Sequence, residues 1–217
     1  MTTDWTAVIP VKRLGAAKSR LRGAVPAARH RDLALAMLRD TAAAVLACPD
    51  VAELLVVTDD PEAAAAAAGL GARPVPDRPD TGLNDAVRHG ADVAAGLQRD
   101  RVVLTGDLPA LRPDELGRAL HGVRNRCFVP DAAGTGTVLL AAPAGTPLDP
   151  RFGADSAAAH ARSGAIPLGG DWPGLRQDVD TAADLRAVVV LGPGPHTCAL
   201  LRDLGVADCG SSRLPAA

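Results

Sequence analysis

Aromatic side chains are almost missing from this chain, which has two tryptophans, two phenylalanines and no tyrosine. Because 47% of the residues are still apolar, a sizeable core can form from alanine, valine and leucine. No apolar run reaches the length of about 18 residues that a membrane span needs, and no charged-then-apolar leader is found. The four cysteines form no CxxC pair. We therefore expect a cytoplasmic protein. We expect it to have no membrane partner and no zinc or disulfide framework.

Lysine is also scarce. Of the 23 basic residues only Lys12 and Lys18 are lysines, and they lie close together near the start of the chain. The formal net charge of −2 argues against a broad basic surface and hence against a nucleic-acid partner. A lysine ammonium is a compact point charge that can reach a phosphate without the planar fork of arginine.

The two lysines belong to a basic segment, residues 12–22, that follows a predicted first strand at 6–11. Arg13 and two further arginines raise its positive charges to five among small residues. Exposed backbone N–H groups beside cations suit a triphosphate. The segment is not a Walker A loop, because Ala17 precedes Lys18 and no glycine lies five residues earlier. A solvated basic loop is the alternative.

A second feature is the run 102–109, Val-Val-Leu-Thr-Gly-Asp-Leu-Pro. Its apolar start predicts a strand buried on both faces, and the glycine and proline end that strand. Asp107 is left at the carboxyl end, where ligands bind in open α/β sheets and where a lone acid suits magnesium. The alternative is that Asp107 caps the turn before the helix that begins at Pro113.

Strands alternate with helices almost throughout, which predicts an α/β fold: a three-layer α/β/α domain around a mostly parallel, Rossmann-like sheet. One domain spans 1–217, with a loose end from about residue 205. The expected strands are 6–11, 52–58, 73–76, 102–104, 126–130 and 136–142. The expected helices are 26–47, 62–68 capped by Asp60, one ending near 97, 113–121, 157–162, 182–190 and a last one near 200–204.

Other polar residues leave two interpretations open each. Asn84 could read a base edge or be a first-turn helix residue. Ser156, after Arg-Phe-Gly-Ala-Asp, could help to seat an anion or share an ordinary Asp or Ser cap with its neighbour. Asp178 and Asp180 alternate along an extended stretch and suit a cation, although Asp180 could cap the next helix.

Five segments in order carry a family resemblance: VIPVKRLGAAKSRL, TGDLPAL, GTGT, RFGADS and QDVDTAADL. Together they resemble the phosphoenolpyruvate or 2-phospho-L-lactate guanylyltransferases of deazaflavin coenzyme F-420 biosynthesis, over about residues 6–190. The family is related to the molybdenum-cofactor guanylyltransferases and implies the nucleotide-diphospho-sugar transferase fold. The alanine- and arginine-rich composition resembles the actinobacterial branch, which implies phosphoenolpyruvate as acceptor of GMP from GTP.

The resemblance also implies residue roles. Asp107 and Lys18 are expected to be catalytic, and Asp107 with Asp180 to bind Mg2+, with Asp178 as the rival of Asp180. The expected substrate contacts are Lys12, Arg13, Lys18 and Asn84 for GTP, and Thr137, Gly153 and Ser156 for phosphoenolpyruvate.

Several other functions would use some of the same residues. The alternatives are transfer to 2-phospho-L-lactate, molybdopterin or a sugar phosphate, a glycosyltransferase in which Asp178-Val179-Asp180 mimics a DxD motif, and a non-catalytic nucleotide-binding module. The motif's position near the chain end counts against the glycosyltransferase, and the lysines with Asp107 count against the module. Two further partners are considered: a second copy of the chain, in a homodimer, and the downstream transferase, in a transient contact.

Overall fold

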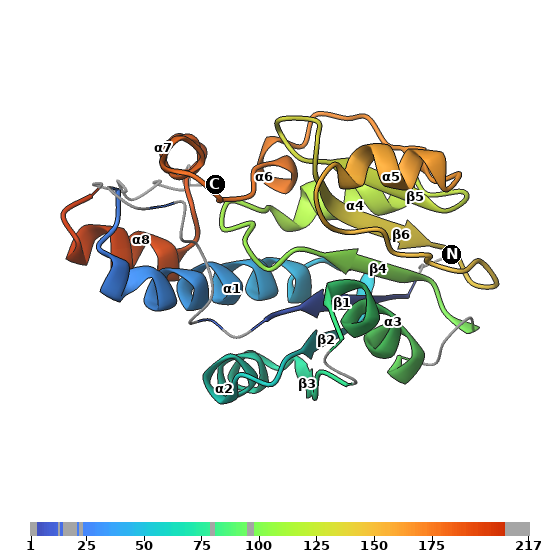
Figure 1. The fold of residues 1–217 in the computed structure, drawn as a ribbon, viewed down its shortest axis with the longest axis horizontal. Coiled ribbons are helices and arrows are strands. Elements are labelled where there is room, and N and C mark those ends of the chain that lie inside the picture. The colour runs from blue at the N-terminus through green and yellow to red at the C-terminus, as the bar shows by residue number, and fades with distance from the viewer. Residues whose placement is uncertain are drawn as a thin grey trace, which may run out of the picture.

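A seven-stranded sheet carries the structure, a computed structural model that describes residues 4–12, 14, 21, 24–78, 81–94 and 98–206 (Figure 1). The strands are β1 (Trp5–Pro10), β2 (Val51–Val57), β3 (Arg73–Val75), β4 (Arg101–Leu104), β5 (Cys127–Pro130), β6 (Thr137–Ala142) and β7 (Ile166–Pro167). Their order is β3-β2-β1-β4-β6-β5-β7. Only β6 is antiparallel to its neighbours, β4 and β5. The predicted mostly parallel sheet is confirmed.

Helices cover both faces of this sheet. The helical elements are η3 (Ala27–Arg29), α1 (His30–Leu46), α2 (Pro61–Leu70), α3 (Leu83–Val93), α4 (Pro113–His121), α5 (Ser156–Arg162), α6 (Pro173–Arg176), α7 (Ala182–Leu191) and α8 (Pro195–Asp203). Apolar residues of α1, α2 and α4 pack on one face, and those of α3 and α5 pack on the other. This is the predicted three-layer arrangement. A third cluster joins α1 to α7 and α8, which lie beside it in Figure 1.

Strand β4 lies at the centre of the sheet, as its sequence predicted. Every one of its residues is buried. Val102 and Leu104 contribute to the core under α1 and α4, whereas Val103 contributes to the core under α3. A strand covered on both faces needs apolar side chains at successive positions, which explains the unbroken run.

Helix ends follow local capping chemistry, with one correction. Asp60 caps α2 through the N–H groups of Glu62 and Ala63, as predicted. At α7, however, the cap is Thr181 and not Asp180: the Thr181 hydroxyl accepts from the N–H of Asp184, whose carboxylate bonds back in a capping box. A hydroxyl and a carboxylate three residues apart satisfy two N–H groups at once, which Asp180 alone would not do.

Three shorter elements differ from the prediction. The helix expected from residue 26 begins as the 3-10 turn η3 and becomes α-helical at His30. The turn expected at 172–174 starts the one-turn helix α6. Strand β7 was not expected; it has two residues and pairs with β5.

The carboxylate of Asp40, on α1, holds the start of α8. It accepts from the N–H groups of His196, at 3.0 Å, and Thr197, at 2.7 Å. A Cβ at Gly194 would lie 2.5 Å from this carboxylate, so the approach requires glycine. The end of the chain that the structure describes is thereby fixed to the first long helix.

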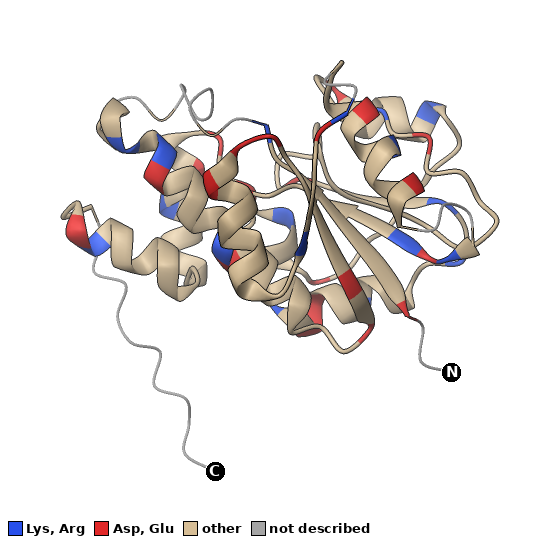
Figure 2. Ribbon diagram, turned by 90° about the horizontal axis from the view of Figure 1, so that it is seen from below, with Lys and Arg blue, Asp and Glu red and all other residues tan. Residues whose placement is uncertain are grey.

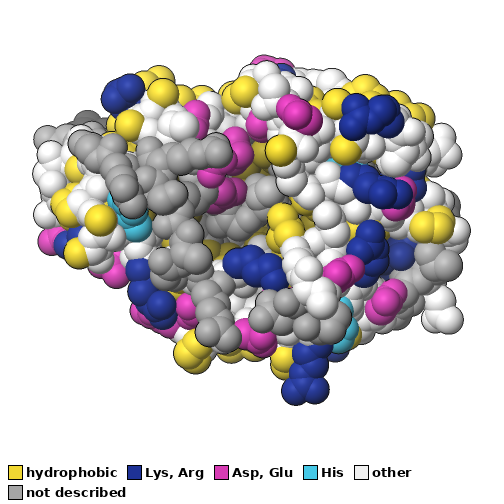
Figure 3. All heavy atoms as spheres, viewed as in Figure 1, with side chains coloured by type: hydrophobic (Ala, Val, Ile, Leu, Met, Phe, Trp, Pro, Cys, Tyr) yellow, Lys and Arg dark blue, Asp and Glu magenta, His cyan; other side chains and the backbone are white. Residues whose placement is uncertain are grey.

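Charged residues lie mainly on helices and in loops, as Figure 2 shows. Acidic and basic side chains are interspersed over the face seen in Figure 3. Within the part of the chain that the structure describes, no helix is both long and apolar enough to cross a membrane.

Candidate active site

The predicted site residues follow strands whose ends meet at one edge of the sheet. Strands β1, β2 and β4 run in parallel, so their carboxyl ends share that edge. Because β6 is antiparallel to β4, its first residues return to the same edge: the N–H of Thr105 donates to Val138 O at 3.0 Å. Lys12, Asp107 and Thr137 are therefore brought to one side of the sheet, where α/β folds bind ligands.

Lys12 lies against an acidic group at this edge. Its Nζ contacts Asp77 Oδ2 at 2.7 Å, and the N–H of Asp77 donates to Asp59 Oδ1 at 3.1 Å. The Asp77 side chain is 5% exposed and that of Lys12 42%. The contacts join the segments after β1, β2 and β3. Arg13 and Lys18 lie outside the described residues.

Asp60 connects the basic segment to helix α2. Besides capping α2, it accepts from the N–H of Leu14 at 3.2 Å and from Arg31 at 3.3 Å. Burial raises the pKa of this carboxyl, but the backbone N–H groups of Ala63, Leu14 and Glu62 together hold it below its ordinary value. Asp60 is thus a fixed anion with a structural task, in agreement with the cap prediction.

The turn that carries Asp107 is held by α1. The N–H of Leu108 donates to the buried hydroxyl of Thr41 at 3.0 Å, and that hydroxyl donates to Met37 O at 2.8 Å. Asp107 itself is half-buried. Helix α4 begins after Arg112 with no capping side chain. The alternative in which Asp107 caps the turn before α4 stays a prediction.

The late acids follow a segment that runs beside this turn. A Cβ at Gly174 would lie 2.2 Å from the carbonyl oxygen of Ala110, which shows how closely the two backbones approach. Val179 is fully buried in the same apolar cluster as Ala110. Its neighbours Asp178 and Asp180 are half-buried and exposed, respectively. Among the described residues no group of three or more His, Cys, Asp or Glu could hold a metal by itself.

Of the predicted acceptor residues, Thr137 contacts His160, and Ser156 starts the helix that carries it. Thr137 is 5% exposed, and its Oγ1 lies 2.9 Å from His160 Nδ1. Ser156 is buried at the start of α5, and Asp155, the N-cap residue, makes no capping side-chain bond. The ordinary-cap interpretation of this helix start is therefore wrong. Gly153 has a φ of 135°, a conformation that favours glycine.

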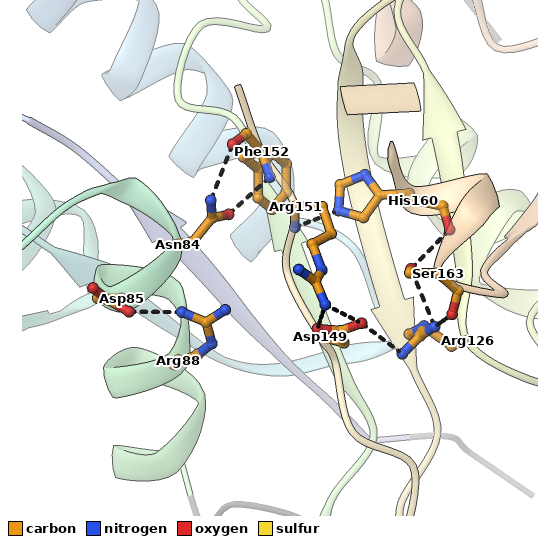
Figure 4. Close-up of polar contacts among 9 residues, drawn as sticks. All are labelled: Asn84, Asp85, Arg88, Arg126, Asp149, Arg151, Phe152, His160 and Ser163. Atoms are coloured by element: carbon orange, nitrogen blue, oxygen red, sulfur yellow. Dashed lines mark hydrogen bonds and ion pairs between the residues drawn. The ribbon is translucent and has the colours of Figure 1, made fainter. Parts of the chain in front are cut away.

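Asn84 is bonded to the same loop. Its Nδ2 donates to Phe152 O at 3.0 Å, and its Oδ1 accepts from the N–H of Phe152 at 2.7 Å (Figure 4). Both ends of the amide thus hold Phe152, which lies 68 positions away in sequence. Phe152 belongs to the loop of residues 149–153 before α5, which we call the acceptor loop. The prediction that Asn84 contacts GTP is not tested by this contact.

Charged groups fix the other end of the acceptor loop. Asp149, with a φ of 43°, contacts Arg151 at 3.0 Å and Arg126 at 3.6 Å. Arg126 also donates to the carbonyl oxygen of Ser163, after α5. Figure 4 shows this chain of contacts between the loop and the end of α5. His160, Arg126 and Asp149 were not predicted as site residues, because their partners are distant in sequence and no motif marks them.

The fold is similar to that of a structural class, the nucleotide-diphospho-sugar transferases, and this likeness concerns the fold alone. A solved structure assigned to this class, from Desulfovibrio desulfuricans G20, superposes with a TM-score of 0.72 at 17% identity and covers 94% of this chain and 96% of its own. Residues 5–164 match the family described as "Guanylyl transferase CofC like", and the chain belongs to this family. The resemblance found in the sequence motifs is confirmed.

Two relatives extend the match beyond those residues. The phosphoenolpyruvate guanylyltransferase of Salinispora arenicola is 62% identical and covers 92% of this chain and 94% of its own length. The protein of the same name from Geodermatophilus obscurus is 55% identical, with 91% and 94% covered.

Proposed function

We propose that this protein transfers GMP from GTP to the phosphate of phosphoenolpyruvate, giving enolpyruvyl-diphospho-5'-guanosine and pyrophosphate. The observation that carries the proposal is 62% identity, over nearly the whole chain, to a relative named for this activity. The family assignment and the gathering of Lys12, Asp107 and Thr137 at one sheet edge support it. The reaction would serve deazaflavin coenzyme F-420 biosynthesis in the cytoplasm.

The chemistry needs positioning more than proton transfer. A phosphate oxygen of phosphoenolpyruvate forms a bond to the α-phosphorus of GTP, while the bond from that phosphorus to its bridging oxygen breaks. The electron pair of the broken bond leaves with pyrophosphate. Because the attacking phosphate is already anionic at neutral pH, no general base is required. The rate then depends on alignment and on neutralising the phosphate charges.

Each predicted residue has a place in this scheme. Lys12, Arg13 and Lys18 would neutralise the GTP phosphates, and Lys18 would act on charge at the α-phosphate or the leaving group. Asn84, on the first turn of α3, would lie beside the nucleoside while holding the acceptor loop. The acceptor would be held by Thr137, Gly153 and Ser156.

The donor set also fits a divalent cation. Mg2+ is typically held by one or two carboxylates, and the remaining positions go to water and substrate phosphates. Asp107 and Asp180 would provide those carboxylates, with Asp178 as the rival of Asp180. The two segments that carry them run side by side, as the contact of Gly174 with Ala110 indicates. When bound, the metal ion would neutralise phosphate charge.

The test is pyrophosphate release from GTP and Mg2+, with phosphoenolpyruvate and 2-phospho-L-lactate offered in separate reactions. Each reaction also contains the downstream deazaflavin acceptor and its transferase, which consume a labile product. Release with phosphoenolpyruvate alone is the expected result. Release with 2-phospho-L-lactate alone would keep the family chemistry and overturn the acceptor. If folded protein releases no pyrophosphate with either compound, the proposal is contradicted.

A further inference from the structure

The side chain of His160 joins two parts of the predicted acceptor site, since it contacts Thr137 and the backbone of Arg151. It is fully buried on α5, between the rings of Phe128 and Phe152, whose centroids lie 5.8 and 5.2 Å from that of the imidazole. The Phe152 ring stands edge-on, at 78°. The ring is therefore packed against two aromatic side chains, and its two nitrogens face different partners.

The hydrogen bonds at this ring select one tautomer. The backbone N–H of Arg151 donates to Nε2 at 2.9 Å, and a backbone N–H can only donate. Nε2 must then carry no proton. In a neutral imidazole the proton is on the other nitrogen, so Nδ1–H faces Thr137 Oγ1 at 2.9 Å.

The surroundings keep the ring neutral. Burial lowers the pKa of His160 to about 4, while the backbone of Ser156 opposes the shift. Arg126 and Arg151 lower it further, and Asp149 raises it. At neutral pH the ring is therefore the Nδ1–H imidazole. It cannot act as a general base, since its acceptor nitrogen is occupied.

This tautomer determines the direction of one hydroxyl hydrogen. Thr137 Oγ1 accepts from Nδ1–H, so the hydrogen of its own hydroxyl is directed to another acceptor. The same ring holds the N–H of Arg151, and Asn84 holds the N–H and carbonyl of Phe152. Three polar groups of the backbone just before Gly153 are thus fixed by two side chains.

We propose that His160 is a positioning residue of the acceptor site, which turns the Thr137 hydroxyl hydrogen toward an anionic oxygen of the bound acceptor and fixes the backbone that leads to Gly153. The inference rests on the proposed function, because it takes the ligand to be a phosphorylated carboxylic acid. A hydroxyl held as a donor favours an anion over a neutral group at this position.

The first test needs no turnover. Long-range nitrogen–proton NMR of the uniformly 15N-labelled protein reports the tautomer of each of its five histidines. The His160 signals are identified by their loss in His160→Asn, and exposed His121→Asn is the matched control. We expect a protonated Nδ1 and an unprotonated Nε2 that do not titrate between pH 8 and about pH 5.5. An Nε2–H tautomer, or titration near the ordinary pKa, would overturn the inference.

The second test separates the two contacts of the ring. Thr137→Val removes the hydroxyl and keeps the shape, and is expected to raise KM for phosphoenolpyruvate about 10- to 100-fold with KM for GTP unchanged. Thr137→Ser should restore most of the loss. In His160→Asn the amide nitrogen takes the place of Nδ1, whereas in His160→Gln the amide oxygen takes the place of Nε2. Asn should therefore retain more acceptor affinity than Gln.

A double-mutant cycle completes the test. If His160 acts through Thr137, adding His160→Gln, which keeps an acceptor for the N–H of Arg151, to Thr137→Val should leave KM for phosphoenolpyruvate nearly unchanged. His160→Asn, which spares the contact with the hydroxyl, shows the effect of losing the loop contact by itself. Full multiplication of the two effects would overturn the inference. A wild-type protein inactive with phosphoenolpyruvate would instead refute the proposed function, and the NMR result would still decide the tautomer.

Discussion

The contact between Asn84 and Phe152 gives a prediction that separates the two halves of the site. In the wild type, Asn84 Oδ1 lies 2.7 Å from the nitrogen of Phe152, and Asn84 Nδ2 lies 3.0 Å from its carbonyl oxygen. Replacing Asn84 by Asp keeps the first oxygen but puts a second oxygen in the place of the nitrogen that donates to the carbonyl. Two acceptors then face each other, and the loop must move. Leaving a half-buried polar group without its donor costs about 1–2 kcal/mol, since full burial costs about 1–3. This corresponds to a loss of about 5- to 30-fold in affinity for phosphoenolpyruvate.

The assay is steady-state pyrophosphate release with each substrate varied in turn. We expect Asn84→Asp to raise KM for phosphoenolpyruvate within that range and KM for GTP by less. Asn125→Asp adds the same charge on an exposed turn and is the matched control. An effect confined to GTP would refute the positional reasoning and would favour a contact of Asn84 with the nucleoside alone.

Further predictions concern stability. Asp40→Ala removes the acceptor of two N–H groups at the start of α8 and should lower the free energy of unfolding by about 1–3 kcal/mol in urea titrations. The pKa of His160 is about 4 in the folded protein and 6.5 for an ordinary histidine, so the unfolded chain takes up a proton first as the pH falls. From pH 7 to 5 the free energy of unfolding of the wild type should therefore fall by roughly 2 kcal/mol more than that of His160→Gln. Equal slopes would contradict this. Gly174→Ala should destabilise by about 1–3 kcal/mol through overpacking, whereas Gly69→Ala, a helix position with open space, should stabilise by about 0.5–1 kcal/mol.

The layers of the fold could be predicted because local patterns determine them. The apolar run at 102–104 has no polar position, which is typical of a strand covered on both faces, and β4 is buried throughout. Asp60 could be recognised as a cap from its place before Pro61. Strand β7 could not be predicted, because two residues show no periodicity and the strand is defined by its pairing with β5. For α7 the Thr181–Asp184 spacing is a capping signal that could have been used.

Only part of the candidate site could be predicted from the sequence. Its place at the end of a predicted strand marked Asp107, whereas the family resemblance marked Thr137. The partners of Thr137 could not be found this way: His160 lies 23 positions away and meets Thr137 only after β6 and α5 have packed. The amide pair of Asn84 likewise depends on a contact across 68 positions. Such contacts depend on tertiary packing, which leaves no periodic signal in a single sequence.

The most direct test of the account is to identify the phosphorus-containing products formed from GTP and phosphoenolpyruvate. In 31P NMR, taken during turnover with Mg2+ present, we predict one new diphosphate that joins guanosine to enolpyruvate and an equal amount of pyrophosphate. Free GMP with pyrophosphate would mean hydrolysis, in which water and not phosphoenolpyruvate attacks. GDP with a new phosphate ester would place the attack at the γ-phosphorus. Either result would contradict guanylyl transfer to phosphoenolpyruvate.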